Sequence, residues 1–149
     1  MSPFNLLDGE LDVESTRAGY VWRATRVGDR IGAERIGATL YDVAAGERTW
    51  PHHFHHGVEE WLYVVSGAPT VRTSDGERVL RPGDLMCFPA GAGGAHSVLG
   101  PGRVLILSAN HSPSISVYPD SDKLGTRPPD DRDRLDFRRG DAVDYWDGE

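Results

Sequence analysis

Short runs of apolar and β-branched residues, most of them four to eight residues long, recur along the chain, and the 18 glycines and 10 prolines punctuate them. Runs of this length and composition are typical of β-strands, and the step Ser74-Asp75-Gly76-Glu77 indicates a β-hairpin. The predicted strands are residues 20–27, 36–43, 61–65, 70–73, 78–80, 84–88, 96–99, 104–108 and 115–118. The pattern therefore predicts an all-β sandwich or barrel.

The last thirty residues have a different pattern. From Asp120 onward the chain has ten acidic and six basic residues, and Pro128-Pro129 precedes a stretch in which the two signs alternate. Mixed charge of this kind is typical of solvated surface, so we expect residues 120–149 to form an exposed arm without a part in the function. The apolar residues available to hold this arm against the barrel or a second subunit are Phe137, Val143, Tyr145 and Trp146.

The composition fits a single domain spanning residues 1–149. One cysteine, Cys87, excludes an internal disulfide and a cysteine-based zinc or iron–sulfur site, and its place beside Phe88 in an apolar run predicts that it lies in the core. A net charge of −7 without a basic cluster argues against a nucleic-acid partner. Because the chain has neither a long apolar run nor a basic leader, we expect a cytoplasmic protein with no membrane partner.

One nine-residue stretch holds four histidines and two glutamates. In an extended chain, residues two apart point to the same side, so His53 and His55 can bind one metal ion together. A helix would instead pair His52 with His56, but Pro51 and the β-type sequence that follows favour a strand.

Two further ligands must come from elsewhere in the chain. After the turn at Gly57, either Glu59 or Glu60 can point back at the same ion, and the alternation of apolar residues does not separate them. His96 follows a glycine-rich loop and supplies a third imidazole. Three imidazoles and one carboxylate suit one divalent ion of iron, manganese, nickel, copper or zinc, with positions left open for water, dioxygen or a substrate.

These residues stand in two spaced motifs. The first runs from Gly46 through His53-Phe54-His55 and Glu60 to Gly67, and the second from Gly83 through Pro89-Ala90-Gly91 to His96. In these motifs the sequence resembles small single-domain cupins, over residues 36–109. The resemblance implies a jelly-roll barrel, also called a double-stranded β-helix, with a short N-terminal arm and an extended, charged C-terminal arm. It also implies that His53, His55, Glu60 and His96 bind the metal, since the six-residue interval before Gly67 selects Glu60 over Glu59.

The resemblance implies a class of chemistry without naming a substrate. We expect a metal-dependent enzyme of the oxygenase or isomerase/epimerase type acting on a small polar metabolite. The alternative is a non-catalytic protein that binds a small molecule and uses the metal for docking or for structure. No cluster of arginines near the motifs indicates a substrate.

Two more expectations concern catalysis and assembly. Tyr41 and His111 are the candidates for catalytic groups, although Tyr41 is more typical of barrel packing and His111 of a plain loop. Cupin barrels commonly pair through an edge strand, and the apolar Tyr20, Val21 and Trp22 predict a homodimer formed in this way.

Overall fold

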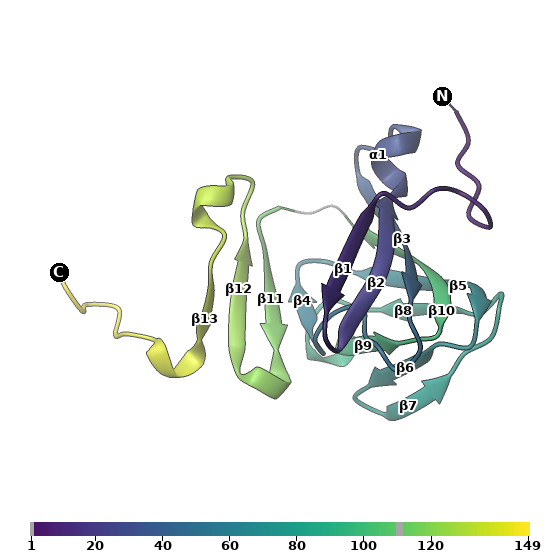
Figure 1. Cartoon of the computed structure of the whole chain (residues 1–149). Helices are drawn as coiled ribbons and strands as arrows, with labels where there is room; N and C mark the ends of the chain where they lie inside the picture. The colour runs from purple at the N-terminus through teal and green to yellow at the C-terminus, as the bar shows by residue number, and fades with distance from the viewer. Residues whose placement is uncertain (1, 110–111) are drawn as a thin grey trace.

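The computed structural model describes residues 2–109 and 112–149 and consists mainly of two antiparallel β-layers (Figure 1). One layer is a six-stranded sheet in the order β1-β2-β3-β10-β5-β8. Its strands are β1 (Val13–Arg17), β2 (Tyr20–Arg26), β3 (Ile36–Val43), β10 (Gly102–Ala109), β5 (Glu60–Gly67) and β8 (Leu85–Phe88). The central position of β10, between β3 and β5, brings residues from distant parts of the chain together.

The second layer combines two smaller sheets. One has the order β13-β12-β11-β4, with strands β13 (Asp136–Arg138), β12 (Lys123–Arg127), β11 (Ser114–Tyr118) and β4 (Phe54–His56). The other has the order β7-β6-β9, with strands β7 (Gly76–Val79), β6 (Thr70–Thr73) and β9 (His96–Leu99). His53 and His96 join the two sheets through a pair of backbone hydrogen bonds of 3.0 and 2.8 Å. This layer completes the predicted jelly roll.

The core lies between the two layers and follows from the alternation of side chains along each strand. In β5, Leu62 and Val64 are fully buried, whereas Trp61 between Glu60 and Leu62 is largely exposed. In β10, Val104 and Ile106 are buried in the same way. Glu60 shares the inward parity of Leu62 and Val64, so the pleat of β5 turns its carboxylate into the barrel.

Most predicted strands are confirmed, and the differences lie near the two ends of the chain. Strand β1 is mostly exposed and carries polar residues, so it lacks the apolar alternation by which a strand is predicted. Residue 27, predicted to end a strand, instead begins the short helix α1 (Val27–Ile31). Gly32 ends that helix with φ +77°, a conformation that favours glycine.

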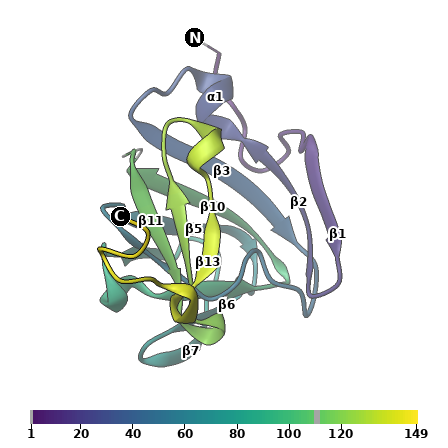
Figure 2. The same cartoon turned by 90° about the vertical axis from the view of Figure 1, so that its left-hand side faces the viewer.

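The C-terminal segment, defined here as residues 112–149, is only partly the exposed arm that the sequence predicts. Strand β12 pairs with β11, and β13 pairs with β12, so an ordered sheet stands on one side of the barrel (Figure 1). Seen from that side, β11 and β13 stand in front of β5 and β10 (Figure 2). Val143, Tyr145 and Trp146 are 71–84% exposed, so they do not pack on the barrel in this structure, and contact with a second subunit stays a prediction.

Two predictions about surface residues are also wrong. Cys87 is exposed, because alternation in β8 turns Phe88 inward and Cys87 outward. Tyr20, Val21 and Trp22 lie in β2, which is hydrogen-bonded on both sides, so the edge strands of this sheet are β1 and β8 instead. The homodimer itself stays a prediction.

Among the described residues, no helix is both long enough and apolar enough to span a membrane.

Candidate metal centre

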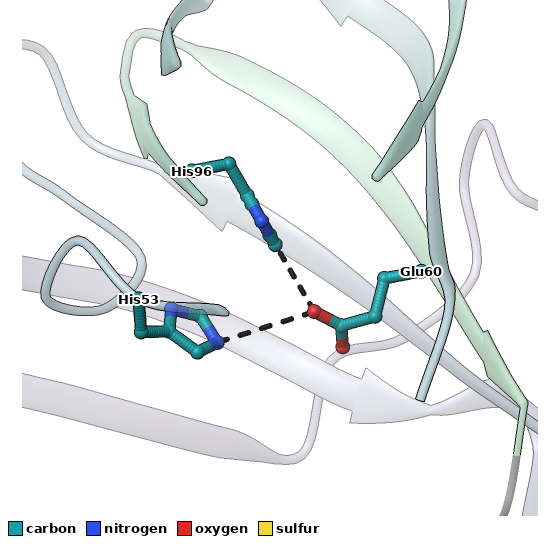
Figure 3. A group of neighbouring side chains, drawn as sticks. All are labelled: His53, Glu60 and His96. Carbon is teal, nitrogen blue, oxygen red and sulfur yellow. Dashed lines mark ion pairs between the residues drawn. The ribbon is translucent and has the colours of Figure 1, made fainter. Parts of the chain in front are cut away.

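Four residues predicted as metal ligands meet between the two layers of the barrel. His55 lies in β4 and His53 directly before it, Glu60 is the first residue of β5, and His96 is the first residue of β9. Figure 3 shows the imidazoles of His53 and His96 turned toward the carboxylate of Glu60. We call these four residues the His/Glu cluster.

The ligand atoms of the cluster lie at distances that suit one shared cation. His53 Nε2 is 3.0 Å from His55 Nε2. Glu60 Oε2 is 3.3 Å from His55 Nε2, 3.5 Å from His96 Nε2 and 4.0 Å from His53 Nε2. Two donors bound at right angles to one ion through bonds of about 2.1 Å lie about 3.0 Å apart, and opposite donors lie about 4.2 Å apart. The observed distances fall within this range, and the ligand atoms of His53, Glu60 and His96 lie within 4.8 Å of one another, so these three residues can hold a metal ion to which His55 Nε2 is also close.

The other ring nitrogen of each histidine has its own partner, which orients the imidazole. His53 Nδ1–H donates to the carbonyl of Pro51 at 3.0 Å, and His96 Nδ1–H donates to the carbonyl of Gly94 at 2.9 Å. The Nδ1 atom of His55 lies 3.1 Å from Ser116 Oγ. Because a carbonyl only accepts, the first two contacts place the proton on Nδ1 and leave the Nε2 lone pairs free for a cation.

The protonation of the cluster also suits metal binding. Burial, together with neighbouring His96 and His55, lowers the pKa of His53 to about 3, and burial likewise lowers the pKa of His96. Burial alone would raise the pKa of Glu60, but His55 and the other two imidazoles outweigh this and hold the pKa below its usual range. At neutral pH His53 and His96 are therefore neutral imidazoles, and Glu60 is a carboxylate. Its buried Glu60 Oε2 and His96 Nε2 have no hydrogen-bond partner, as expected of atoms that bind a cation.

Two neighbours hold His96 in place. The ring of Phe88 stacks on the imidazole with centroids 3.8 Å apart. The loop before His96 packs so closely that a Cβ atom on Gly94 would lie 1.9 Å from the carbonyl oxygen of Pro89. Only glycine fits there, and its carbonyl is the partner of His96 Nδ1. This confirms the close packing that the glycine-rich loop predicts.

A cavity of about 280 Å³ adjoins the cluster and is lined by His53, His55 and Glu60. Its other polar lining residues are Thr39, Tyr41, Ser108, Ser116, Tyr118, Arg127 and Arg134, and Trp50 and Ile106 complete it. Five of these side chains carry hydroxyl groups, which hydrogen-bond to hydroxyl or carbonyl oxygens of a ligand. The lining therefore suits a small polar molecule.

Tyr41 lies in this lining, whereas the other catalytic candidate, His111, lies outside the described residues. Burial, reinforced by the negative charge of Glu60, raises the pKa of Tyr41 to about 12. The phenol therefore stays protonated at neutral pH and acts as a hydrogen donor. Its ring packs edge to face against Trp50 at 5.3 Å, so Tyr41 also has the packing role that the sequence predicts.

The remaining residues of the histidine-rich stretch point elsewhere. Glu59 accepts a hydrogen bond of 2.8 Å from Trp61 Nε1 outside the barrel. His56 is exposed and lies against Phe54, and His52 is buried without lining the cavity. The tertiary structure thus shows that Glu60 belongs to the site and Glu59 does not, a distinction that the alternation of apolar residues along the sequence did not make.

Sequence reasoning missed several lining residues, including Thr39, Ser108, Ser116 and Tyr118, and the two arginines Arg127 and Arg134 are the charged ones among them. Both belong to the C-terminal segment, which was expected to have no part in the function, and they reach a cavity built by strands far earlier in the chain. No local pattern distinguishes them from the other arginines of this segment. The pairing of β12 with β11, and of β11 with β4, brings them there.

Comparison with known proteins supports this architecture. A family model for the cupin domain matches residues 39–110. Residues 39–110 are a cupin domain. The matched region contains all four members of the His/Glu cluster, and cupins of this kind often bind a metal ion. No curated protein matches the chain.

Several solved structures share the fold of this chain. The chain is similar to a putative sugar phosphate isomerase from Acidithiobacillus ferrooxidans, with 26% identity over 91% of this chain and 88% of that chain, at a TM-score of 0.77. It is also similar to a sugar phosphate isomerase of the cupin superfamily from Silicibacter pomeroyi, with 21% identity over 98% of both chains and a TM-score of 0.81. A polyketide cyclase from Streptomyces resistomycificus matches with 22% identity over 76% of this chain and 83% of that chain, at a TM-score of 0.59. The second likeness extends the shared fold over the C-terminal strands.

Proposed function

We propose that this cupin is a metal-dependent isomerase of small, hydroxyl-rich metabolites. The observation that carries the proposal is the convergence of three imidazole Nε2 atoms and Glu60 Oε2 beside a cavity lined by hydroxyl groups. The likeness to a structure named as a putative sugar phosphate isomerase, at 26% identity over most of both chains, supports the same class of reaction.

The residues of the site would have two roles, which are metal binding and proton transfer. His53, His55, Glu60 and His96 would hold the metal, which supplies Lewis acidity toward a carbonyl or hydroxyl oxygen of the bound substrate. The contacts at Nδ1 keep the imidazoles oriented without the substrate. Tyr41 lines the same cavity with a protonated hydroxyl, which can donate a proton to a substrate oxygen.

The character of the lining favours an isomerase over an oxygenase. Thr39, Ser108 and Ser116 place hydroxyl groups along the cavity and suit a substrate with several oxygens. Isomerisation of such a molecule needs no second substrate, because the hydrogen that leaves one carbon returns to the neighbouring carbon. An oxygenase would also need dioxygen and a metal that activates it, such as iron, manganese, nickel or copper.

The test combines metal analysis with an isomerisation assay. Protein purified without an affinity tag should contain about one transition metal ion per chain, and it should interconvert members of a panel of aldoses, ketoses and their phosphates followed by NMR. The Tyr41→Phe variant should keep the metal but lose about 100-fold or more in kcat. The double variant His53→Ala/His55→Ala should lose both the metal and the activity. Equal metal content in this variant and the wild type would contradict the proposed centre.

A second candidate function is a non-catalytic cupin that binds a small molecule at the metal. In its favour, Glu60 is the single carboxylate among the described residues that line the cavity, and every histidine in that lining belongs to the cluster. No separate general base is therefore present in the lining. Metal-dependent binding of a polyol, without interconversion and without exchange of its carbon-bound hydrogens in heavy water, would favour this candidate.

A further inference from the structure

The C-terminal segment places two guanidinium groups at the cavity beside the His/Glu cluster. Arg127 is the last residue of β12, and Arg134 follows the 3-10 turn Asp131–Asp133. Both line the cavity that His53 and Glu60 also line, and they are the cationic side chains of that lining among the described residues. The position is notable because the whole chain has a net charge of −7.

Arg127 is held firmly by its neighbours. Its guanidinium donates to Tyr118 Oη at 2.7 Å, to the carbonyl of Thr126 at 2.7 Å and to the carboxylate of Asp136 at 3.1 Å. The ring of Tyr118 in turn stacks on His53, with centroids 5.8 Å apart. One side chain, that of Tyr118, therefore separates the fixed Arg127 from His53, a proposed metal ligand. Asp136 balances part of the positive charge of Arg127.

Arg134 differs from two nearby arginines, Arg132 and Arg139, which lie close to carboxylates. Arg132 is paired with Asp130, and Arg139 lies 3.3 Å from Asp122. Within residues 2–109 and 112–149, Arg134 forms no ion pair, so its charge is available to a ligand in the cavity. The two positive charges of Arg127 and Arg134 and the negative charge of Asp136 leave a net positive charge on this side of the cavity.

We propose that Arg127 and Arg134 bind a phosphate group on the substrate, while its hydroxyl-bearing end lies at the His/Glu cluster. The planar guanidinium presents parallel N–H donors that match phosphate oxygens, and a phosphate monoester carries nearly two negative charges at neutral pH. A cavity of about 280 Å³ suits a small metabolite. The inference deepens the proposed function and rests on it for the reaction, whereas phosphate binding by the two arginines can be measured by itself.

The test measures binding of inorganic phosphate to the full-length chain by calorimetry at low ionic strength. Wild-type protein, Arg134→Gln and Arg132→Gln are compared, each as purified and after removal of metal by a chelator. Arg134→Gln should weaken binding by about tenfold or more through loss of a charge-assisted contact, and Arg134→Lys should restore part of it. Arg132→Gln is the matched control, because it removes an equal charge from the neighbouring 3-10 turn, and it should bind as the wild type does.

Three outcomes would overturn the inference. These are equal affinity of Arg134→Gln and wild type, equal weakening in Arg132→Gln, and complete loss of binding after chelation in every protein, which would place the phosphate on the metal. Because Arg134 is exposed, the melting temperature of Arg134→Gln should equal that of the wild type, which separates a binding defect from misfolding.

The inference and the proposed function fail in different ways. Phosphate binding that depends on Arg134, without any interconversion of sugars or sugar phosphates, would retain the arginine site and reject the isomerase. Interconversion of free sugars with a kcat/KM equal to that of their phosphates, with no phosphate binding, would retain the isomerase and reject the arginine site.

Discussion

The His/Glu cluster, through His53, His55 and Glu60, and the C-terminal segment contribute to the same cavity in opposite ways. The cluster is buried: the side chain of His96 is 1% exposed and that of Glu60 14% exposed. The C-terminal segment is largely exposed and charged, and it reaches the cavity through Arg127, which is 23% exposed, and through Arg134. The barrel thus supplies the candidate metal ligands, and the segment outside it supplies positive charge.

The contrast reflects what each kind of ligand requires. Metal coordination tolerates errors of only a few tenths of an ångström, so its ligands belong on paired strands whose side chains are locked by packing and by second hydrogen bonds. Attraction between opposite charges falls off slowly with distance and tolerates a looser placement. A change in the barrel, including the residues of β11 that pair with β4, should therefore affect metal binding and stability, whereas a change in the exposed part of the C-terminal segment beyond β11 should affect neither.

The largest effect is expected from removing a buried ligand. His96→Ala should reduce the metal content from about one ion per chain to background, because one of four donors is lost and a cavity opens beside Phe88. His56→Ala is the matched control, since His56 is exposed and points away from the cluster, and its metal content should be unchanged. Elemental analysis of untagged protein measures both, and equal metal loss in the two variants would contradict the assignment.

A truncation in the core should be nearly as damaging. Leu62 is fully buried in β5, and Leu62→Ala should lower the free energy of unfolding by about 2–5 kcal/mol, measured by urea denaturation. The comparison variant is Leu135→Ala in the C-terminal segment, where Leu135 is 57% exposed, and its effect should stay within about 0.5 kcal/mol. Similar losses in both would mean that Leu135 is packed as tightly in solution as the core residue Leu62.

An intermediate effect is expected from the partner of His55. Ser116→Ala removes the hydroxyl that lies 3.1 Å from His55 Nδ1 and frees the imidazole to rotate. Metal affinity should fall about tenfold, with little change in the melting temperature of the metal-free protein. Competition with a chromophoric chelator measures the affinity. Ser112→Ala is the control in the C-terminal segment, because Ser112 Oγ donates to the carbonyl of Arg127 rather than to a ligand.

Acid should destabilise the metal-free barrel through His53. Its pKa is about 3 in the folded protein and about 6.5 in the unfolded chain, so between these values the unfolded state binds more protons. Stability contributed by neutral His53 is therefore present above about pH 6.5 and is lost as the pH falls toward 3. Melting temperatures of chelated wild type should fall more steeply between pH 7.5 and 4.5 than those of His53→Asn, and parallel curves would contradict this.

The smallest effect is expected at the C-terminus. Deletion of residues 142–149 removes Val143, Tyr145 and Trp146, which are exposed in the described structure. The melting temperature and the metal content should both stay unchanged, as read by calorimetry and elemental analysis. A lower melting temperature would show that these apolar side chains are buried in solution, against the barrel or in the predicted homodimer, and light scattering at micromolar concentration separates the two cases.

Much of the barrel follows from local pattern. The strands of the core alternate apolar and polar residues, and the motifs that resemble those of cupins predict that His53, His55, Glu60 and His96 gather. Strand β1 was not predicted, because an exposed edge strand has no apolar face to reveal it. The prediction for Cys87 was wrong because a continuous apolar run does not show which of its residues face inward. In β8, Phe88 faces inward and packs against His96, so the neighbouring Cys87 faces outward.

The sequence by itself determined the fold class, because strand periodicity is a local property of the chain, and its resemblance to cupins predicted the four residues of the His/Glu cluster. The tertiary structure decided that Glu60 faces inward while Glu59 bonds to Trp61. It also decided that Arg127 and Arg134 line the cavity, because only pairing across β4, β11 and β12 carries them there. Pairing between strands that are far apart in the chain produces no periodic pattern in the sequence. The sequence of the acidic C-terminal segment therefore did not indicate that Arg127 and Arg134 line the cavity.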